Sequence, residues 1–299
     1  MLKVNKFAFT FLFTILSTFA VTSQAESVDK SKNINLISPW TNTGSSHALG
    51  QKQSEMLAEK GWNLTNGRGY QSAGNCLNAF NVIDNSDDPS IYIWEDAYHT
   101  KDFGDPCYKD PIKESELVSL WYTWTEYMCR TDEDLPTIDN ATGTVTLGVP
   151  PVYSFGEDKL KVVEAMTNAE VRIIRYENIP SVLNGAKVGE VDYVYGMLAP
   201  NSERTKDVLS CSYNSSKATV NGTKSISESF DNIDYSYVGV AYLVSHDLDQ
   251  NTINEFRKDW HETIENEEIS SVFKSRSWVP PQAFSDMSRK EIYQMVIGE

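Results

Sequence analysis

The stretch Val171–Gly196, VRIIRYENIPSVLNGAKVGEVDYVYG, decides the fold class. Its first six positions are rich in β-branched residues, an amphipathic segment follows Asn178, and a second β-rich run ends at Gly196. Two strands joined through a short helix with almost no loop form a βαβ unit, in which the strands run parallel. The stretch therefore predicts an α/β protein whose strand ends open onto a ligand site.

The same alternation of strands and helices occurs in two parts of the chain. In the first part, β-rich runs at 34–38 and 90–94 enclose two segments with helical spacing, at about 45–60 and 73–83. In the second part, strands are predicted at 144–149, 171–176 and 191–195, with helices at 156–167 and 178–187. Two further β-rich runs, at 207–213 and 235–244, precede a helix that carries Ile253, Phe256, Trp260 and Ile264 on one face, and a capping box at Ser288–Glu291 begins a last helix.

This order predicts two α/β lobes that face each other across a cleft, because ligands bind beyond the carboxyl ends of parallel strands. Residues 26–130 together with 235–299 are predicted to form the first lobe, and residues 131–234 the second.

The first 25 residues have the features of an export signal. Lys3 and Lys6 precede an apolar core at 7–20, and Ser23-Gln24-Ala25 provides small residues for a signal peptidase. The apolar core is shorter than the roughly 20 residues that a bilayer span needs. We therefore expect cleavage after Ala25 and a mature protein in the periplasm.

The composition limits the classes of partner. The net charge is −16, and the leader contributes two lysines and no acidic residue, so the mature chain is more acidic still. Nucleic acids and anionic membranes bind to clusters of Lys and Arg, so neither is expected as a partner of this acidic chain. A small anion remains possible, because the N–H groups at helix N-termini bind anions without a net positive charge.

The four cysteines are Cys76, Cys107, Cys129 and Cys211. An even number in an exported chain predicts two disulfides, for which three pairings are possible. The loop-rich segment between Cys107 and Cys129 favours that pair. No C-x-x-C spacing indicates a metal or redox site, and no metal is expected.

We find no motif for catalysis or for a cofactor. His47 follows Ser46, but neighbours on a helix point to different faces, and there is no G-x-S-x-G, H-E-x-x-H, phosphate-binding or dinucleotide motif. We therefore predict no catalytic residue, no cofactor and no enzymatic activity. An exported hydrolase and the ligand-sensing domain of a signalling system are the alternatives.

Three tryptophans and Tyr122 could line the cleft and select an aromatic or flat ligand. Trp94 ends a predicted strand whose tip faces the cleft, and we expect it to contact the ligand. Core packing is favoured for Trp121 and Trp124. His47 is predicted either to donate to a ligand anion or to lie on the surface in the first turn of its helix.

Four segments resemble the receptors of tripartite tricarboxylate transporters, the Bug or TctC-like family of periplasmic binding proteins. Ile37-Ser38-Pro39-Trp40 followed by Thr43-Gly44-Ser45-Ser46 is similar to the family's first strand and ligand loop, and 69–74 to its second loop. Residues 175–192 are similar to its "VPYKG … GqVD" segment, and the layout of 237–273 follows its C-terminal part. His47 stands where the family has an Asp.

The resemblance implies a class II periplasmic-binding-protein fold that closes on a small carboxylate and delivers it to membrane transporter subunits. Family members hold the carboxylate through backbone amides and Ser/Thr hydroxyls, and a monomer is the default state. The implied ligand contacts, with Trp94 added from its strand position, are Trp40, Thr43, Gly44, Ser45, Ser46, His47, Ser72, Ala73, Gly74, Tyr153 and Ser154.

Overall fold

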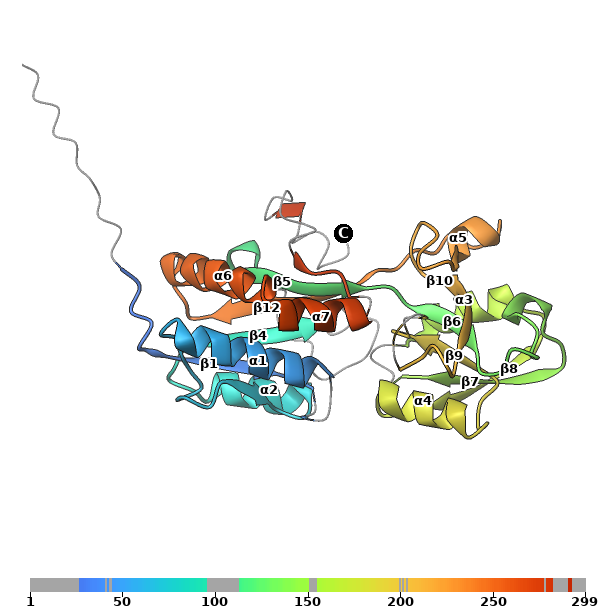
Figure 1. The fold of residues 1–299 in the computed structure, drawn as a ribbon, viewed down its shortest axis with the longest axis horizontal. Helices are drawn as coiled ribbons and strands as arrows, with labels where there is room; N and C mark the ends of the chain where they lie inside the picture. Colours follow the sequence, from blue (N-terminus) through green and yellow to red (C-terminus); the bar gives the residue numbers. More distant parts are fainter. Residues whose placement is uncertain are drawn as a thin grey trace, which may run out of the picture.

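The structure is a computed structural model that describes residues 27–40, 42, 45–95, 113–150, 155–198, 200, 202, 204–276, 278–281 and 290–291. Within these residues the chain forms two six-stranded sheets. Figure 1 shows them as two lobes that lie side by side and are joined by extended segments. The predicted leader and most of the helix predicted after Ser288 fall outside the described residues.

The first sheet has the order β2-β1-β4-β12-β5, and β3 also pairs with β1. Its strands are β1 (Asn33–Ser38), β2 (Asn63–Leu64), β3 (Tyr70–Ser72), β4 (Ser90–Glu95), β5 (Leu117–Trp124) and β12 (Gly239–His246). The first four strands are parallel to one another where they pair, as predicted. β12 enters from the end of the chain and runs antiparallel to both β4 and β5.

The second sheet has the order β11-β10-β6-β9-β7-β8. Its strands are β6 (Tyr127–Arg130), β7 (Thr144–Val149), β8 (Glu170–Arg175), β9 (Tyr193–Gly196), β10 (Ser210–Asn214) and β11 (Lys224–Ser225). β7 is parallel to both β8 and β9, which confirms the βαβ unit predicted from 171–196. β6 is antiparallel to β9 and to β10.

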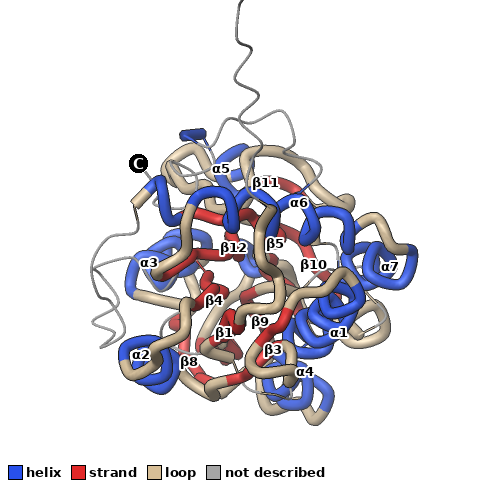
Figure 2. Tube along the Cα trace, turned by 90° about the vertical axis from the view of Figure 1, so that its left-hand side faces the viewer, coloured by secondary structure: helices blue, strands red, loops and turns tan. Residues whose placement is uncertain are grey.

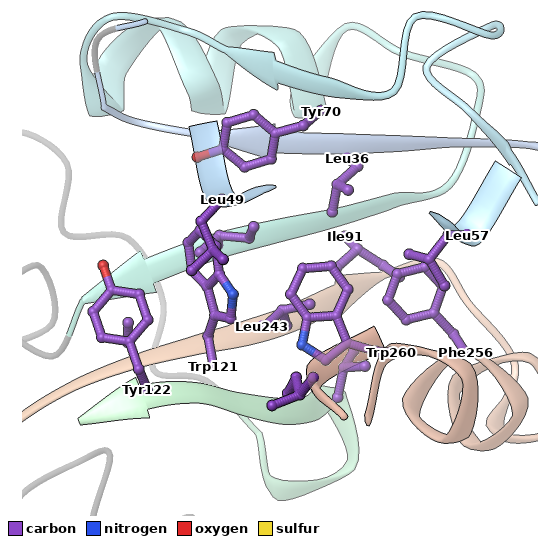
Figure 3. Packing of buried hydrophobic residues seen from close by; sticks show 14 of the residues in the cluster. Leu36, Leu49, Leu57, Tyr70, Ile91, Trp121, Tyr122, Leu243, Phe256 and Trp260 are labelled. Atoms are coloured by element: carbon purple, nitrogen blue, oxygen red, sulfur yellow. The ribbon is translucent and has the colours of Figure 1, made fainter. Parts of the chain in front are cut away.

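Helices cover both faces of the first sheet. α1 (Ser45–Glu59), α6 (Gln250–Ile264) and α7 (Glu267–Arg276) pack on one face, and α2 (Cys76–Asp84) packs on the other. Figure 3 shows how the helices and strands interdigitate their side chains in the first of these layers. Along β12, Leu243 points into one layer and Tyr242 into the other, so the strand is buried on both faces.

Figure 2 views the first lobe end-on, with α2 on the opposite side of the strands from α1, α6 and α7. In the second lobe, α3 (Glu157–Met166) and α4 (Ile179–Lys187) occupy opposite faces of the sheet. Short helical turns occur at η3 (Glu114–Glu116), η4 (Ile138–Asn140) and α5 (Ile226–Ser229).

Two differences from the predicted organisation concern the middle of the chain. β5 and β6 were not predicted as strands, and Trp121 and Trp124 in β5 are buried, which confirms their predicted place in the core. β6 belongs to the second sheet. The chain therefore crosses between the sheets at 125–126, a few residues before the predicted boundary at 130.

The predicted Cys107–Cys129 bridge is wrong. Cys129 forms a disulfide with Cys211 instead. The two residues lie directly opposite each other on the antiparallel pair β6 and β10, so neighbouring strands bring their sulfur atoms together. Cys76 is also disulfide-bonded.

Candidate functional site

The strand registers place the two sets of loops opposite each other. In the first sheet, the end of β4 at Glu95 pairs with Ala241 near the start of β12, beside the point where the chain enters from the second lobe. In the second sheet, the end of β9 at Gly196 pairs with Tyr127, where the chain arrives from the first lobe. The carboxyl ends of both parallel sets therefore face each other across the crossovers, which is where such sheets bind ligands. We call these two rims the facing edges.

On the first facing edge, the two predicted ligand loops meet. Ser38 pairs with Ser72 at the ends of β1 and β3. Past these ends, the Ala73 N–H donates to the Ser38 carbonyl at 2.9 Å, and the Gly74 N–H donates to the Trp40 carbonyl at 3.2 Å. The structure thus brings Trp40, Ser72, Ala73 and Gly74 together.

The same contacts limit what these residues can offer a ligand. The Ser72 hydroxyl also donates to the Trp40 carbonyl, so its proton is used within the protein. The Trp40 ring stacks on Trp121, with 5.6 Å between the ring centroids. The described parts of the two loops, 38–40 and 72–74, are held together by these hydrogen bonds.

Ser46 and His47 lie in the first turn of α1, beside these loops. The Ser46 hydroxyl is 2.9 Å from the Tyr122 hydroxyl, and either group can be the donor. The His47 ring meets the Tyr70 ring edge-on at 5.3 Å, and its buried Nδ1 has no hydrogen-bond partner within the described part of the chain. His47 is half-buried rather than on the open surface.

Tyr122 lies beside this site. It was weighed in the sequence analysis, with three tryptophans, as a residue that could line the cleft, but it was not included among the ligand contacts. It reaches Ser46 from β5, a strand that the sequence analysis missed. Its ring stacks on Trp278, with the centroids 4.1 Å apart. The sequence pattern that could have identified β5 is the run of eight residues at 117–124, in which aromatic and β-branched residues, typical of strands, predominate.

Several predicted contacts cannot be placed. Thr43, Gly44, Tyr153 and Ser154 lie outside the described residues, and of Ser45 only the backbone, at the start of α1, is described.

The prediction that Trp94 contacts the ligand is wrong. The residue is 0 % exposed and packs in the layer beneath α2, where its ring lies 5.0 Å from that of Phe80. The Trp94 side chain lies on the face of β4 that is turned away from α1. The burial contradicts its assignment as an aromatic ligand contact, because position at a strand tip does not fix which face the side chain takes.

The helices that begin at the facing edges differ in how their N-termini are capped. Asn75 caps α2 and Asn178 caps α4, and each accepts a backbone N–H at 2.9 Å. α3 begins after Gly156, which has no side chain to accept a hydrogen bond from the first turn. Within the described residues, no side chain caps this helix, so the first N–H groups of α3 can serve an external acceptor such as a carboxylate.

Arginines occupy both facing edges, and sequence reasoning missed them. Arg276 is the last residue of α7 in the first lobe, and Arg204 follows β9 in the second. Burial, and to a smaller degree the charge of Arg204, lower the pKa of Arg276 to about 10. Burial also lowers the pKa of Arg204. No local motif marks either residue, because they are far apart in the sequence.

A third arginine supports the loop before α3. Arg175, at the end of β8, donates from Nη1 to the Phe155 carbonyl at 2.9 Å, and its guanidinium lies 5.8 Å from the Phe155 ring centroid. It fixes the approach to Gly156 and the open N-terminus of α3.

A serine–histidine contact occurs away from the facing edges. The Ser119 hydroxyl in β5 lies 2.6 Å from His261 Nε2 in α6. Burial lowers the pKa of His261, and so does the nearby cation Arg257, whose guanidinium donates to the backbone carbonyls of β5. A nucleophile–base pair needs a group that stabilises the imidazolium, whereas a cation opposes that charge.

Two other features are absent from the described residues. They contain no group of three or more His, Cys, Asp or Glu arranged to hold a metal ion. Nor do they contain a helix with the length and apolar character that crossing a membrane requires.

No known family model matches the sequence, and no curated protein matches it significantly. Solved structures do match. The periplasmic binding protein BugD has 13 % identity and a TM-score of 0.63, with 89 % of this chain and 94 % of that chain covered. A Rhodopseudomonas palustris protein solved with adipate has 13 % identity and a TM-score of 0.65, covering 90 % and 98 %.

MatC from Rhodopseudomonas palustris, solved with bound malate, has 10 % identity and a TM-score of 0.67, covering 89 % of this chain and 97 % of that chain. Identities this low establish the fold alone. The chain has the two-lobed α/β fold of the Bug and TctC-type periplasmic binding proteins.

Proposed function

We propose that this protein is an exported solute-binding protein that captures a small carboxylate between its lobes and passes it to a membrane transporter of the tripartite tricarboxylate type. The observation that carries the proposal is the meeting of the β1 and β3 loops on one facing edge, opposite the uncapped N-terminus of α3. A buried carboxylate needs several charge-assisted donors, and the N–H groups in the first turns of α1 and α3 can supply them from the two edges.

Two of the structural neighbours support the choice of ligand class, because one was solved with adipate and another with malate. We propose Trp40, Ser46, His47, Ala73 and Gly74 as contacts in the first lobe. The other residues of the two loops, Thr43, Gly44, Ser45 and Ser72, and Tyr153 and Ser154 of the second lobe complete the proposed set. The signal peptide, the periplasmic location and a monomeric state belong to the same proposal.

A thermal-shift screen of dicarboxylates, tricarboxylates and aromatic acids tests the function. A ligand at about 100 times its Kd adds about 2.7 kcal/mol of stability. For a chain of this size we expect a rise in Tm on the order of 5 °C. If no acid raises the Tm while a chromogenic ester is hydrolysed, the binding-protein proposal is wrong and an exported hydrolase replaces it.

The variant Ser46→Trp tests the place of binding. Ser46 is half-buried beside both loops, and an indole there fills the space next to Tyr122. We expect the variant to fold and to lose measurable carboxylate binding in calorimetry. Ser271→Trp on the exposed side of α7 is the control and should bind as the wild type does. Unchanged affinity in Ser46→Trp would remove this loop from the site.

A further inference from the structure

Ser215 lies between the two segments that cross from one lobe to the other, at 125–126 and 235–238 (Figure 1). It directly follows β10 in the second lobe and is 0 % exposed. In the first sheet the crossovers leave neighbouring strands, β5 and β12, whereas in the second sheet β6 has β10 and β9 as its neighbours. The two crossovers therefore separate as they enter the second lobe.

Four hydrogen bonds join Ser215 to both crossovers. Its N–H donates to the Glu126 carbonyl at 3.0 Å, and its hydroxyl oxygen accepts the Glu126 N–H at 3.1 Å. On the other side, its carbonyl accepts the Tyr237 N–H at 2.7 Å, and its hydroxyl donates to the Tyr237 carbonyl at 2.6 Å. Every polar group of Ser215 is thus used to hold the crossovers to the second lobe. We call this arrangement the Ser215 clamp.

Lys159 of α3 contacts the same two residues with its side chain. Its Nζ lies 2.7 Å from Glu126 Oε1 and 3.9 Å from the ring centroid of Tyr237. The clamp and the buried cation both belong to the second lobe. Residues 126 and 237 are therefore fixed to that lobe, although the crossovers lead out of it.

The first lobe holds the crossovers at Trp124 and Gly239. These residues pair at the adjoining ends of β5 and β12, and a Cβ on Gly239 would lie 2.0 Å from the Trp124 ring. One residue of each crossover, Thr125 or Val238, remains between the two fixed ends. Neither makes a backbone hydrogen bond within the described part of the chain. A rotation of one lobe against the other is absorbed most easily by the backbone dihedrals of these two residues.

We propose that Ser215 and Lys159 stiffen the second-lobe end of the hinge, so that the lobes rotate about Thr125 and Val238. A bend that spread into β6 or β10 would break the hydrogen bonds of the clamp and a buried ion pair, whereas rotation at the two intervening residues breaks none of them. Ser215 is accordingly a positioning residue, because it acts through the crossovers and not on the ligand.

The consequence for carboxylate capture rests on the proposed function. A stiff hinge lets the lobes sample few orientations, so the orientation that holds a ligand makes up a larger fraction of the unliganded molecules. The apparent affinity rises with that fraction.

Electron–electron resonance between two nitroxide labels measures the hinge without any ligand. The labels are attached to Ser271→Cys on α7 and Lys161→Cys on α3, and both positions are exposed. We expect Ser215→Ala to broaden the distribution of distances between the labels about twofold, because the Glu126 N–H and the Tyr237 carbonyl each lose a partner.

Ser54→Ala is the matched control for the loss of a buried hydroxyl. The Ser54 hydroxyl accepts the Tyr70 N–H at 3.1 Å and donates to the Gln51 carbonyl at 2.7 Å, and the residue is 1 % exposed. All of these contacts lie within the first lobe. The variant therefore loses the same kinds of hydrogen bond, and its distance distribution should keep the wild-type width.

Glycine substitutions locate the bend independently of the clamp. Glycine gives the backbone more conformational freedom. Val238→Gly acts between the two fixed ends, and Ser236→Gly acts on the second-lobe side of the clamp; both residues are exposed. We expect Val238→Gly to broaden the distance distribution and Ser236→Gly to leave it unchanged. Equal broadening in the two variants would place the bend beyond the clamp and overturn the proposal, even if Ser215→Ala did not fold.

Calorimetry with adipate and malate tests the consequence for capture. Ser215→Ala should weaken the binding of either acid about threefold or more, and Ser236→Gly should change it by less than about twofold. If a folded Ser215→Ala keeps the wild-type distance distribution, the hinge assignment is wrong and the proposed function stands. If the wild type binds no acid here or in the thermal-shift screen, the proposed function fails, while the distance measurements still decide the hinge.

Discussion

Lys159 and Glu126 form an ion pair that is almost wholly removed from water. Lys159 Nζ lies 2.7 Å from Glu126 Oε1, and the two side chains are 7 % and 3 % exposed. Burial raises the pKa of the Glu126 carboxyl, and the charge of Lys159 opposes that rise. The Lys159 ammonium also lies 3.9 Å from the ring centroid of Tyr237. One cation on α3 therefore contacts both segments that cross between the lobes.

Replacing this cation should be costly. Lys159→Met leaves the Glu126 carboxylate buried without its partner, and we expect the free energy of unfolding to fall by about 3–5 kcal/mol. Lys161→Met, on the same helix with its side chain 71 % exposed, should change it by less than about 0.5 kcal/mol. Urea unfolding measures both. Adding Glu126→Gln to Lys159→Met should recover part of the lost stability. If Lys159→Met and Lys161→Met were equally stable, the buried ion pair would not contribute as described.

At the residue scale, the sequence predicted part of the candidate site. The resemblance to the family's loops picked out Trp40, Ser72, Ala73 and Gly74, which the structure does bring together. Trp94 was misplaced because strand position alone does not determine the face a side chain takes. The contact between Ser46 and Tyr122 could not be found because it depends on where β5 lies in the first sheet.

At the scale of elements, the disulfide between β6 and β10 joins strands that are 82 residues apart in sequence. A bridge across so long a loop restricts the unfolded chain strongly, and removing a native disulfide typically costs about 2–5 kcal/mol. We expect Cys129→Ala/Cys211→Ala to lose stability in this range in urea unfolding.

Peptide mapping under non-reducing conditions identifies the bridge directly. The linked peptides should contain Cys129 and Cys211, and the link should persist in Cys107→Ala. A peptide that joins Cys107 to Cys129 would contradict the structure.

The elements that were predicted and those that were missed differ in their sequence pattern. The helix α6 was predicted because Ile253, Phe256, Trp260 and Ile264 recur at helical spacing, and all four are buried. β5 is buried along its whole length and on both faces, so it shows no alternation of polar and apolar residues. For α2, the predicted stripe included Leu77, which is 51 % exposed. Ile83 of the same predicted stripe does lie on the buried face, together with Cys76 and Ala79.

At the scale of the whole molecule, two lobes are joined by crossovers at 125–126 and 235–238 and touch through Trp278 and Met197. Gly239, which ends the second crossover, pairs with Trp124, and a Cβ there would meet the indole ring at 2.0 Å. The ends of the two crossovers are therefore packed closely enough to require glycine at position 239. The two lobes, in contrast, are built on separate sheets. This arrangement permits a hinge motion.

Ligand binding should make the molecule more compact. A compact chain of about 270 residues has a radius of gyration of about 19 Å. We expect the unliganded protein to exceed this value in small-angle X-ray scattering and to shrink toward it when a bound dicarboxylate draws the lobes together. Ser46→Trp should not shrink under the same conditions. A radius that is unchanged in the saturated wild type would rule out closure.

The position of β12 sets the order in which the two sheets can be completed during synthesis. The second sheet is built from residues 127–225 without interruption, whereas in the first sheet β12 lies between β4 and β5. Until Gly239–His246 has emerged from the ribosome, β4 and β5 are unpaired edges, which are prone to aggregate. The second lobe can therefore fold while the first still waits for its central strand. The first lobe therefore exposes unpaired strand edges for longer than the second lobe does.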